Sequence, residues 1–144
     1  MNIEVKVIAR TPLLPTESVD KVKIALLNMV NVDAENVHLE ETDDHSEIIA
    51  SGEGQNSLKK LHMLFREKRI LGAARRKLRR GIRGNDRIYF YLNKQAAFVG
   101  NVSFVDEFTN ESPLGPIEIE MSTNNPEELI DWLAPRTKKG KIIP

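Results

Sequence analysis

The sequence contains no cysteine and only three histidines. Without cysteine there is no disulfide framework, no thiol nucleophile and no cysteine-based zinc site. No apolar run approaches the roughly 20 residues that a membrane-spanning helix needs. The first residues alternate between apolar and polar, unlike the apolar core of a signal peptide. These absences predict no membrane segment and are compatible with the cytoplasm, and 144 residues are the size of a single domain.

The net charge of zero conceals a strongly uneven distribution. Residues 59–87 hold twelve Lys or Arg and two acidic residues, a local charge of +10, whereas residues 1–58 carry −7 and residues 88–144 carry −3. A basic stripe on a neutral protein indicates a localised site for a polyanion rather than general adhesion to one. The alternative is a solvated helix face, or arginines paired with acidic residues elsewhere in the chain.

Leu58 to Arg87 is the segment around which the chain is organised. Apolar residues recur in its second half at the three- and four-residue spacing of one helix stripe; they are Leu71, Ala74, Leu78 and Ile82. Basic residues fall on the other stripes, and the candidates for phosphate contact are Arg75, Arg76, Arg79, Arg80 and Arg83. Guanidinium is a planar fork of donors that fits phosphate geometry.

The same segment also contains two expected interruptions. The apolar stripe of residues 58–65, continued at 3.6 residues per turn, does not align with the later stripe, so a break or kink is expected between Glu67 and Gly72. Gly84 is expected to take the left-handed conformation after the helix C-terminus. Gly81 and Gly84 also match a Gly-x-x-Gly backbone clamp, but a strand follows almost at once, which favours the helix cap.

Elsewhere the periodicity predicts strands over 2–10, 36–41, 47–51, 87–92, 99–105 and 117–122, and helices over 16–30 and 126–133. Tyr89 and Tyr91 should share one face of a central strand, opposite Ile88, Phe90 and Leu92. Residues 93–97 are expected to form a polar turn or a short helical turn, and residues 113–116 a stiff loop. The order predicts an α+β domain over residues 1–134, with a mainly antiparallel sheet and helices on one face. Residues 135–144 are expected to be a mobile basic tail.

No catalytic constellation stands out, and no cofactor site is predicted. His38 and His45 are expected near each other on a hairpin, where two exposed histidines are favoured over a metal site. Lys94 and Gln95 follow a strand end and are further candidates for ligand contact. The alternative is a turn held by the side chain of Asn93. Tyr89 and Tyr91 would stack bases on an open sheet, or serve as core or dimer contacts.

Three stretches together resemble a known family: residues 73–76 (Ala-Ala-Arg-Arg), 91–97 (Tyr-Leu-Asn-Lys-Gln-Ala-Ala) and 112–117 (Ser-Pro-Leu-Gly-Pro-Ile). In this order and spacing they are similar to an archaeal family of small uncharacterised proteins described as RNA-binding. The resemblance covers the chain to about Pro135. It implies a fold like that of ribosomal protein L-five, an archaeal cytoplasm as the location, RNA as the partner, and association with the exosome or another ribonucleoprotein.

Three functions follow from these observations. The first is non-enzymatic RNA binding through the arginine-rich helix, with Lys94, Gln95 and the tail residues Lys138, Lys139 and Lys141 as further contacts. The second is a self-associating scaffold, for example a homodimer, whose basic helix docks on an acidic protein surface. The third is a binder of a small molecule or phosphate ligand.

Overall fold

The structure is a computed structural model that describes residues 3–106 and 115–143. Within these residues the main sheet has seven strands in the order β2-β3-β1-β7-β5-β4, with β6 also paired to β5, and every pairing is antiparallel. The strands are β1 (Val5–Leu13), β2 (Val37–Glu41), β3 (Ser46–Glu53), β4 (Ile82–Arg83), β5 (Arg87–Asn93), β6 (Phe104–Val105) and β7 (Pro116–Thr123). The last strand of this sheet in the chain, β7, thus lies between the first strand and β5.

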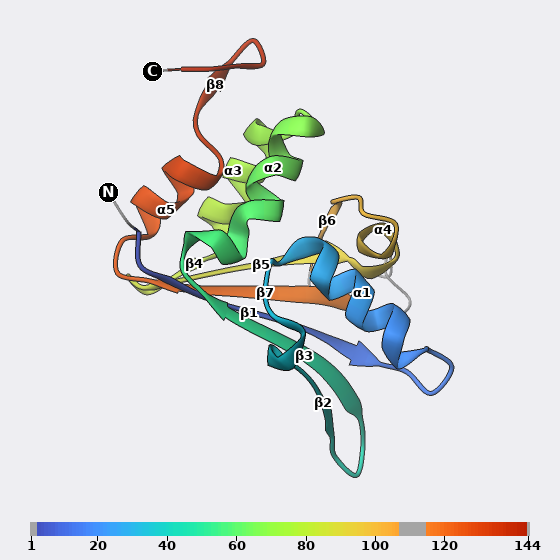
Figure 1. Cartoon of the computed structure of the whole chain (residues 1–144). Helices are drawn as coiled ribbons and strands as arrows, with labels where there is room; N and C mark the ends of the chain where they lie inside the picture. The colour runs from blue at the N-terminus through green and yellow to red at the C-terminus, as the bar shows by residue number, and fades with distance from the viewer. Residues whose placement is uncertain (1–2, 107–114, 144) are drawn as a thin grey trace.

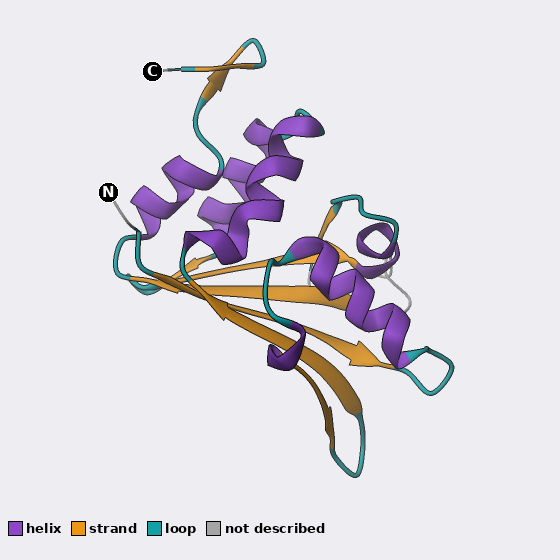
Figure 2. Ribbon diagram, in the orientation of Figure 1, coloured by secondary structure: helices purple, strands orange, loops and turns teal. Residues whose placement is uncertain are grey.

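The helices cover one face of this sheet (Figures 1 and 2). They are α1 (Val19–Met29), α2 (Lys59–Glu67), α3 (Leu71–Arg80), α4 (Lys94–Phe98) and α5 (Pro126–Leu133), with 3-10 turns at Ala34–Asn36 and Gln55–Leu58. Helices α2, α3 and α5 gather over one end of the sheet, and α1 and α4 over the other (Figure 1). The arrangement confirms the predicted α+β class with helices on one face.

Strand alternation explains which face the helices cover. In β1, Val5, Val7 and Ala9 are buried under the helices while Lys6 is exposed. In β5, Ile88, Phe90 and Leu92 are buried, and Tyr89 and Tyr91 lie half-buried on the opposite face, as predicted. The strand also has neighbours on both sides, so it is an interior strand along most of its length.

The predicted break between α2 and α3 is confirmed. Arg69 has a φ of +56°, and its N–H donates to the Arg66 carbonyl at 3.1 Å. The next N–H, of Ile70, reaches back to the Phe65 carbonyl, also at 3.1 Å. This pair of bonds is the Schellman ending, here with arginine at the position usually held by glycine. The turn changes the direction of the chain, so the apolar stripes of α2 and α3 both face the sheet.

The end of α3 differs from the prediction. The helix stops at Arg80, and Ile82 and Arg83 form β4, paired with Ile88 and Arg87. Arg83 is therefore a strand residue, and Gly84, with φ +64°, belongs to the β4–β5 turn rather than to a helix cap. The physical reason is the close approach at Gly81, whose carbonyl accepts from the Tyr89 N–H at 2.9 Å.

Local predictions between residues 93 and 116 had different outcomes. The short helical turn expected over 93–97 is confirmed: residues 94–98 form the helix α4, and the Asn93 side chain accepts a hydrogen bond from the Ala96 N–H at 2.8 Å. The strand expected over 99–105 is reduced to Phe104–Val105. The loop expected over 113–116 lies partly outside the described residues, and Pro116 begins β7.

The C-terminal residues form a small hairpin, β8 (Thr137–Lys138) with β9 (Lys141–Ile142). Its turn is at Lys139 and Gly140, both with positive φ. No packing pattern in the sequence indicates this hairpin, because a two-residue ladder needs only turn chemistry. A Cβ placed on Gly72 of α3 would lie 3.8 Å from Thr137 Oγ1 and 3.6 Å from Arg76 Nη1, so the hairpin starts beside the first turn of α3. Mobility of the tail stays a prediction.

None of the helices in the described ranges is both long and apolar enough to cross a membrane.

Helices α2 and α5 meet at an aromatic stack. The ring of His62 lies 4.6 Å from that of Trp132, with 29° between their planes. Burial, together with the charge of nearby Arg66, lowers the pKa of His62 below its ordinary value. The imidazole is therefore favoured in its neutral form at this contact.

We expect Gly81→Ala to lower the free energy of unfolding by about 2 to 3 kcal/mol, the cost of overpacking. A Cβ at this position would lie 1.8 Å from the Tyr89 carbonyl oxygen. Gly72→Ala in α3 is the matched control, because its Cβ would make only ordinary contacts and alanine is the better helix former by up to about 1 kcal/mol. Urea unfolding measures both variants. Equal destabilisation by the two would contradict the close-approach argument.

A second expectation concerns pH. Because folding lowers the pKa of His62 from 6.5, the unfolded chain binds more protons just below that pH. The contribution of neutral His62 to the free energy of unfolding is complete above pH 6.5. It declines as the pH falls below 6.5, by at most about 1.4 kcal/mol per pH unit. Urea unfolding between pH 7.5 and 5.5 would show this loss through the fluorescence of the single tryptophan. His62→Phe should flatten the dependence, while His38→Gln on the exposed hairpin should retain it.

Candidate nucleic-acid interface

The arginines of α3 divide into an inner pair and an outer group. The inner pair, Arg75 and Arg79, faces α5. Arg75 Nη1 lies 2.8 Å from Asp131 Oδ1 and donates to the Ala134 carbonyl at 3.2 Å, and its side chain is only 15% exposed. Arg79 Nη1 lies 2.7 Å from Glu127 Oε2, one turn along both helices. From the first ion pair to the second, the residue number rises along α3 and falls along α5. The two ion pairs therefore hold the helices antiparallel.

A third arginine supports the same contact from α2. Arg66 donates to the Trp132 carbonyl at 3.2 Å and to the Leu133 carbonyl at 3.4 Å. The last carbonyls of a helix have no partner within it and carry the negative end of the helix dipole. Arg66 and Arg75 supply donors and positive charge there. Part of the basic stripe is therefore structural, which is the alternative that the sequence left open.

The outer group consists of Arg76, Arg80 and Arg83, all exposed. Within the described part of the chain, none of them has a carboxylate within 4.0 Å. Arg83 Nη1 donates to the Arg80 carbonyl at 2.8 Å and to the Ile82 carbonyl at 3.0 Å, which places its guanidinium over the end of α3. Since guanidinium has five donors, the remaining ones stay available to a ligand.

A hollow of about 190 Å³ opens beside the outer group. We call it the edge notch, because it lies where β4 ends its pairing with β5 at Ile88 and β6 begins at Tyr91. Its lining combines cationic and aromatic residues: Lys77, Arg80, Gly81, Arg83, Tyr89, Phe90, Tyr91, Phe104, Val105 and Asp106. Among the described residues of its lining, the single acidic one, Asp106, is paired with Lys77, Nζ to Oδ1 at 3.3 Å.

The basic surface continues to the C-terminal hairpin. Lys138, Lys139 and Lys141 are exposed on β8, β9 and their turn, and the hairpin begins next to Arg76. The predicted tail residues are thus attached to the same end of the molecule as α3 (Figure 1).

Lys94 and Gln95 are not brought to this surface. They belong to α4, in the other group of helices, and line a hollow of about 540 Å³ with α1 residues such as Lys21. The side chain of Lys94 is 4% exposed, and its ammonium lies 3.0 Å from Glu17 Oε1 and donates to the Pro12 carbonyl at 2.6 Å. Burial lowers the pKa of Lys94 despite this pairing. Gln95 is exposed at the rim.

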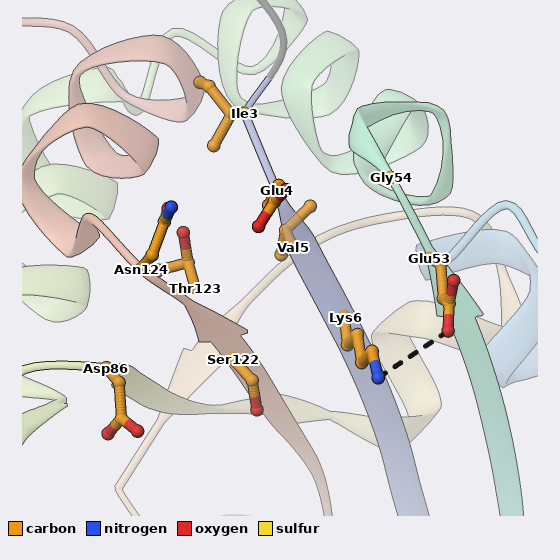
Figure 3. Close-up of a pocket in the computed structure, with 10 residues that line it drawn as sticks. All are labelled: Ile3, Glu4, Val5, Lys6, Glu53, Gly54, Asp86, Ser122, Thr123 and Asn124. Atoms are coloured by element: carbon orange, nitrogen blue, oxygen red, sulfur yellow. Dashed lines mark ion pairs between the residues drawn. The ribbon is translucent and has the colours of Figure 1, made fainter.

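A larger hollow in the described part of the chain, about 680 Å³, is acidic (Figure 3). It lies at the end of the sheet where β1 begins and β7 ends, and Glu4, Glu53 and Asp86 line it. Among the described lining residues the one cation, Lys6, forms an exposed ion pair with Glu53 at 3.9 Å. This composition disfavours a phosphate ligand, so size alone does not identify the polyanion site.

His38 and His45 do not face each other across the hairpin. His38 is in register with Ile49 in the β2–β3 pair, whereas His45 lies in the turn, its Nδ1 3.1 Å from Thr42 Oγ1. No cluster of three or more potential metal ligands occurs over residues 3–106 and 115–143.

Sequence reasoning missed a charged network on the open face of the sheet. Glu120 on β7 is 8% exposed although no helix covers it, because Arg10 of β1 and Arg87 of β5 flank it at 3.4 and 2.6 Å. A hydrogen bond with Tyr89, together with the Glu120 carboxylate, raises the pKa of Arg87. The sequence feature that could have indicated this network is the alternation of charged residues in three strands. The order of these strands in the sheet, which brings the charges together, was not predicted.

The geometry defines a class: an α+β domain with one open sheet face and an arginine-rich edge. A family model described as RNA binding matches residues 6–123, and the chain belongs to this family. Relatives include a UPF0201 protein of Metallosphaera sedula, 43% identical over 138 residues that span 96% of this chain and 93% of the relative. A second, from Sulfurisphaera tokodaii, is 44% identical over 135 residues, 94% of this chain and 90% of that one.

Solved structures agree. The crystal structure of a UPF0201 protein from Methanococcus jannaschii is 34% identical with a TM-score of 0.78, covering 96% of this chain and 99% of the other. A DUF54 protein from Methanothermobacter thermautotrophicus shares the fold with a TM-score of 0.58 at 16% identity, covering 93% and 98%. The predicted resemblance to an archaeal RNA-binding family is confirmed.

Neighbouring arginines test the division into two groups. We expect Arg75→Gln to lower the free energy of unfolding by about 1.5 to 3 kcal/mol, the range for hydrogen bonds to charged groups. Arg76→Gln makes the same chemical change on the exposed side and should stay within about 0.5 kcal/mol of the parent. Chemical unfolding of both variants at one salt concentration decides the matter. A neutral Arg75→Gln would show that the contacts with α5 contribute little.

Proposed function

We propose that the protein binds RNA, without an enzymatic step, through the outer arginines Arg76, Arg80 and Arg83. The observation that carries the proposal is that these guanidinium groups are exposed and lack carboxylate partners in the described structure. An exposed, uncompensated arginine surface on a chain of zero net charge is an electrostatic footprint for a polyanion. Membership of a family described as RNA binding favours RNA among polyanions.

The basic hairpin extends this surface. Lys138, Lys139 and Lys141 add charge at the same end, and a lysine ammonium serves as a point contact for phosphate. Phosphate contacts fix position but carry no sequence information. The outer arginines and the hairpin therefore suit recognition of the RNA backbone and its shape.

The remaining predicted residues take other roles in the proposal. Arg75 and Arg79 position α5 against α3, and so hold the helix that presents the outer group. Lys94 joins α4 to the chain before α1 through Glu17 and the Pro12 carbonyl. Gln95 stays beside it, away from the arginine edge. We accordingly propose no RNA contact for Lys94 and Gln95.

Self-association is a second candidate, and the strand order favours it. The β2–β3 hairpin, at the opposite edge of the sheet from β4, projects from the body (Figure 1). It carries exposed Glu40, Glu41, Asp43 and Asp44. An acidic edge and a basic edge on one sheet suit head-to-tail contact between copies. Association with an exosome or another ribonucleoprotein remains a prediction of the family resemblance.

The test is a triple variant, Arg76→Gln, Arg80→Gln and Arg83→Gln, titrated with RNA at several salt concentrations. Each phosphate contact contributes about −0.7 to the slope of log affinity against log salt for single strands and about −0.9 for duplexes. The triple variant should bind more weakly and flatten the slope by roughly two to three units. Fluorescence anisotropy of a labelled RNA measures both effects.

Lys6→Gln, Lys21→Gln and Lys59→Gln together form the matched control, because these exposed residues remove the same charge away from the arginine edge. An equal loss in both triple variants would indicate non-local attraction and contradict the proposed surface. Salt-sensitive oligomers without RNA, abolished by the arginine variant, would instead support self-association; analytical ultracentrifugation detects them.

A further inference from the structure

We propose that the edge notch receives one unstacked base of the bound RNA. The preferred ligand is then single-stranded RNA or a loop or bulge rather than an uninterrupted duplex. This inference rests on the proposed function, because it assumes that the outer arginines hold the RNA backbone. It adds a base-contacting element that no phosphate surface supplies.

The composition of the notch matches an unstacked nucleotide. Tyr89, Tyr91 and Phe104 contribute to its walls, and Lys77, Arg80 and Arg83 are the cations among its lining residues. Unpaired bases in RNA are typically held on aromatic rings or guanidinium planes, with the flanking phosphates on basic residues. Both kinds of group occur here within one hollow of about 190 Å³, which suits one base and is too small for a base pair.

The charge of the notch separates it from the other hollows. Among the described residues that line the notch, Lys77, Arg80 and Arg83 are cationic and Asp106 alone is acidic, and Asp106 is ion-paired with Lys77. The described lining of the acidic hollow in Figure 3 has the reverse composition, with three carboxylates and one ammonium. The hollow between α1 and α4 holds one exposed lysine, Lys21, and a buried, ion-paired one, Lys94. Of these three, the notch alone joins aromatic residues to several arginines.

The strand pattern explains why the notch exists and what it excludes. Two strands of two residues each, β4 and β6, share the same edge of β5 and leave a gap between them. The gap is unsuited to an added peptide strand, because the Tyr89 N–H already donates to the Gly81 carbonyl at 2.9 Å and Tyr91 is in register with Val105. An extended peptide therefore could not add to β5 as a further strand here, because the backbone groups of β5 already have partners in this chain.

The experiment compares four RNAs of equal length: a single strand, a perfect duplex, the duplex with a one-nucleotide bulge, and the same bulge lacking its base. We expect the single strand and the bulged duplex to bind at least about fivefold more tightly than the perfect duplex, since stacking contributes roughly 1 to 3 kcal/mol per base. The abasic bulge should lose this advantage. Equal affinity for bulged, abasic and perfect duplexes would overturn the inference.

Ring-removing variants locate the effect. Tyr89→Leu and Tyr91→Leu should each reduce the preference for the bulged duplex by about fivefold or more while leaving affinity for the perfect duplex unchanged. Phe98→Leu is the control, because Phe98 is an exposed aromatic residue of α4 outside the notch. If both tyrosine variants kept the preference for the bulged duplex over the perfect duplex, the base would bind elsewhere and its assignment to the edge notch would be refuted.

A measurement on the parent protein does not depend on how the variants fold. 2-Aminopurine placed at the bulge changes its fluorescence when its stacking changes. This fluorescence should change when the protein is added. An excess of unlabelled bulged RNA, with no abasic competitor present, should return it to the value of the free RNA. No change on saturation would contradict base insertion. If the arginine triple variant loses binding but no RNA form is preferred, the proposed function stands and the notch inference fails. If no RNA binds the parent protein, the proposed function itself fails.

Discussion

Placement of β7 between β1 and β5 is the constraint on which the rest of the structure depends. Its apolar residues Ile117, Ile119 and Met121 are fully buried beneath the helices, and its two neighbours come from distant parts of the chain. Burying that apolar row stabilises the sheet by an amount proportional to the area removed from water. Without β7, β5 would have no partner along its inner edge, and β4, β6 and the notch between them would lose their support.

On the open face, the same strand places a carboxylate between two arginines. Glu120 is nearly buried there, and Arg10 and Arg87 compensate its charge from the neighbouring strands. A buried carboxylate without such partners would be strongly unfavourable. The pairing thus supports one register of β7 against both β1 and β5, because a shift by one residue would turn Glu120 toward the apolar core.

The basic stripe of α3 combines two tasks that its sequence does not distinguish. Arginines at the same helical spacing either hold α5 or remain in solvent, and the difference is set by the direction in which α5 returns across α3. Arg75 and Arg79 meet Asp131 and Glu127 because both helices advance by one turn between the contacts. A surface ion pair of this kind contributes little when exposed and more when partly buried, so Arg75, the more buried of the two, is the more important for stability.

Much of the fold followed from local patterns. Alternation identified the strands, the rotation of the apolar stripe located the break before Leu71, and the period of two placed Tyr89 and Tyr91 on one face. These features depend on residues close in sequence, so a single sequence contains them. The end of α3 escaped prediction because helical spacing continues through Ile82, whereas the contact between Gly81 and Tyr89 is a tertiary one.

The sequence by itself determined the α+β class, the concentration of positive charge between residues 59 and 87, and the residue types available to bind a polyanion. Only the tertiary structure decided which arginines are exposed, that Lys94 is buried against Glu17, and that two short strands leave a notch beside Tyr89. The reason is that exposure and pairing depend on which distant segments pack together. That packing is set by the order of strands in the sheet and by the path of α5, neither of which is encoded in the spacing of neighbouring residues.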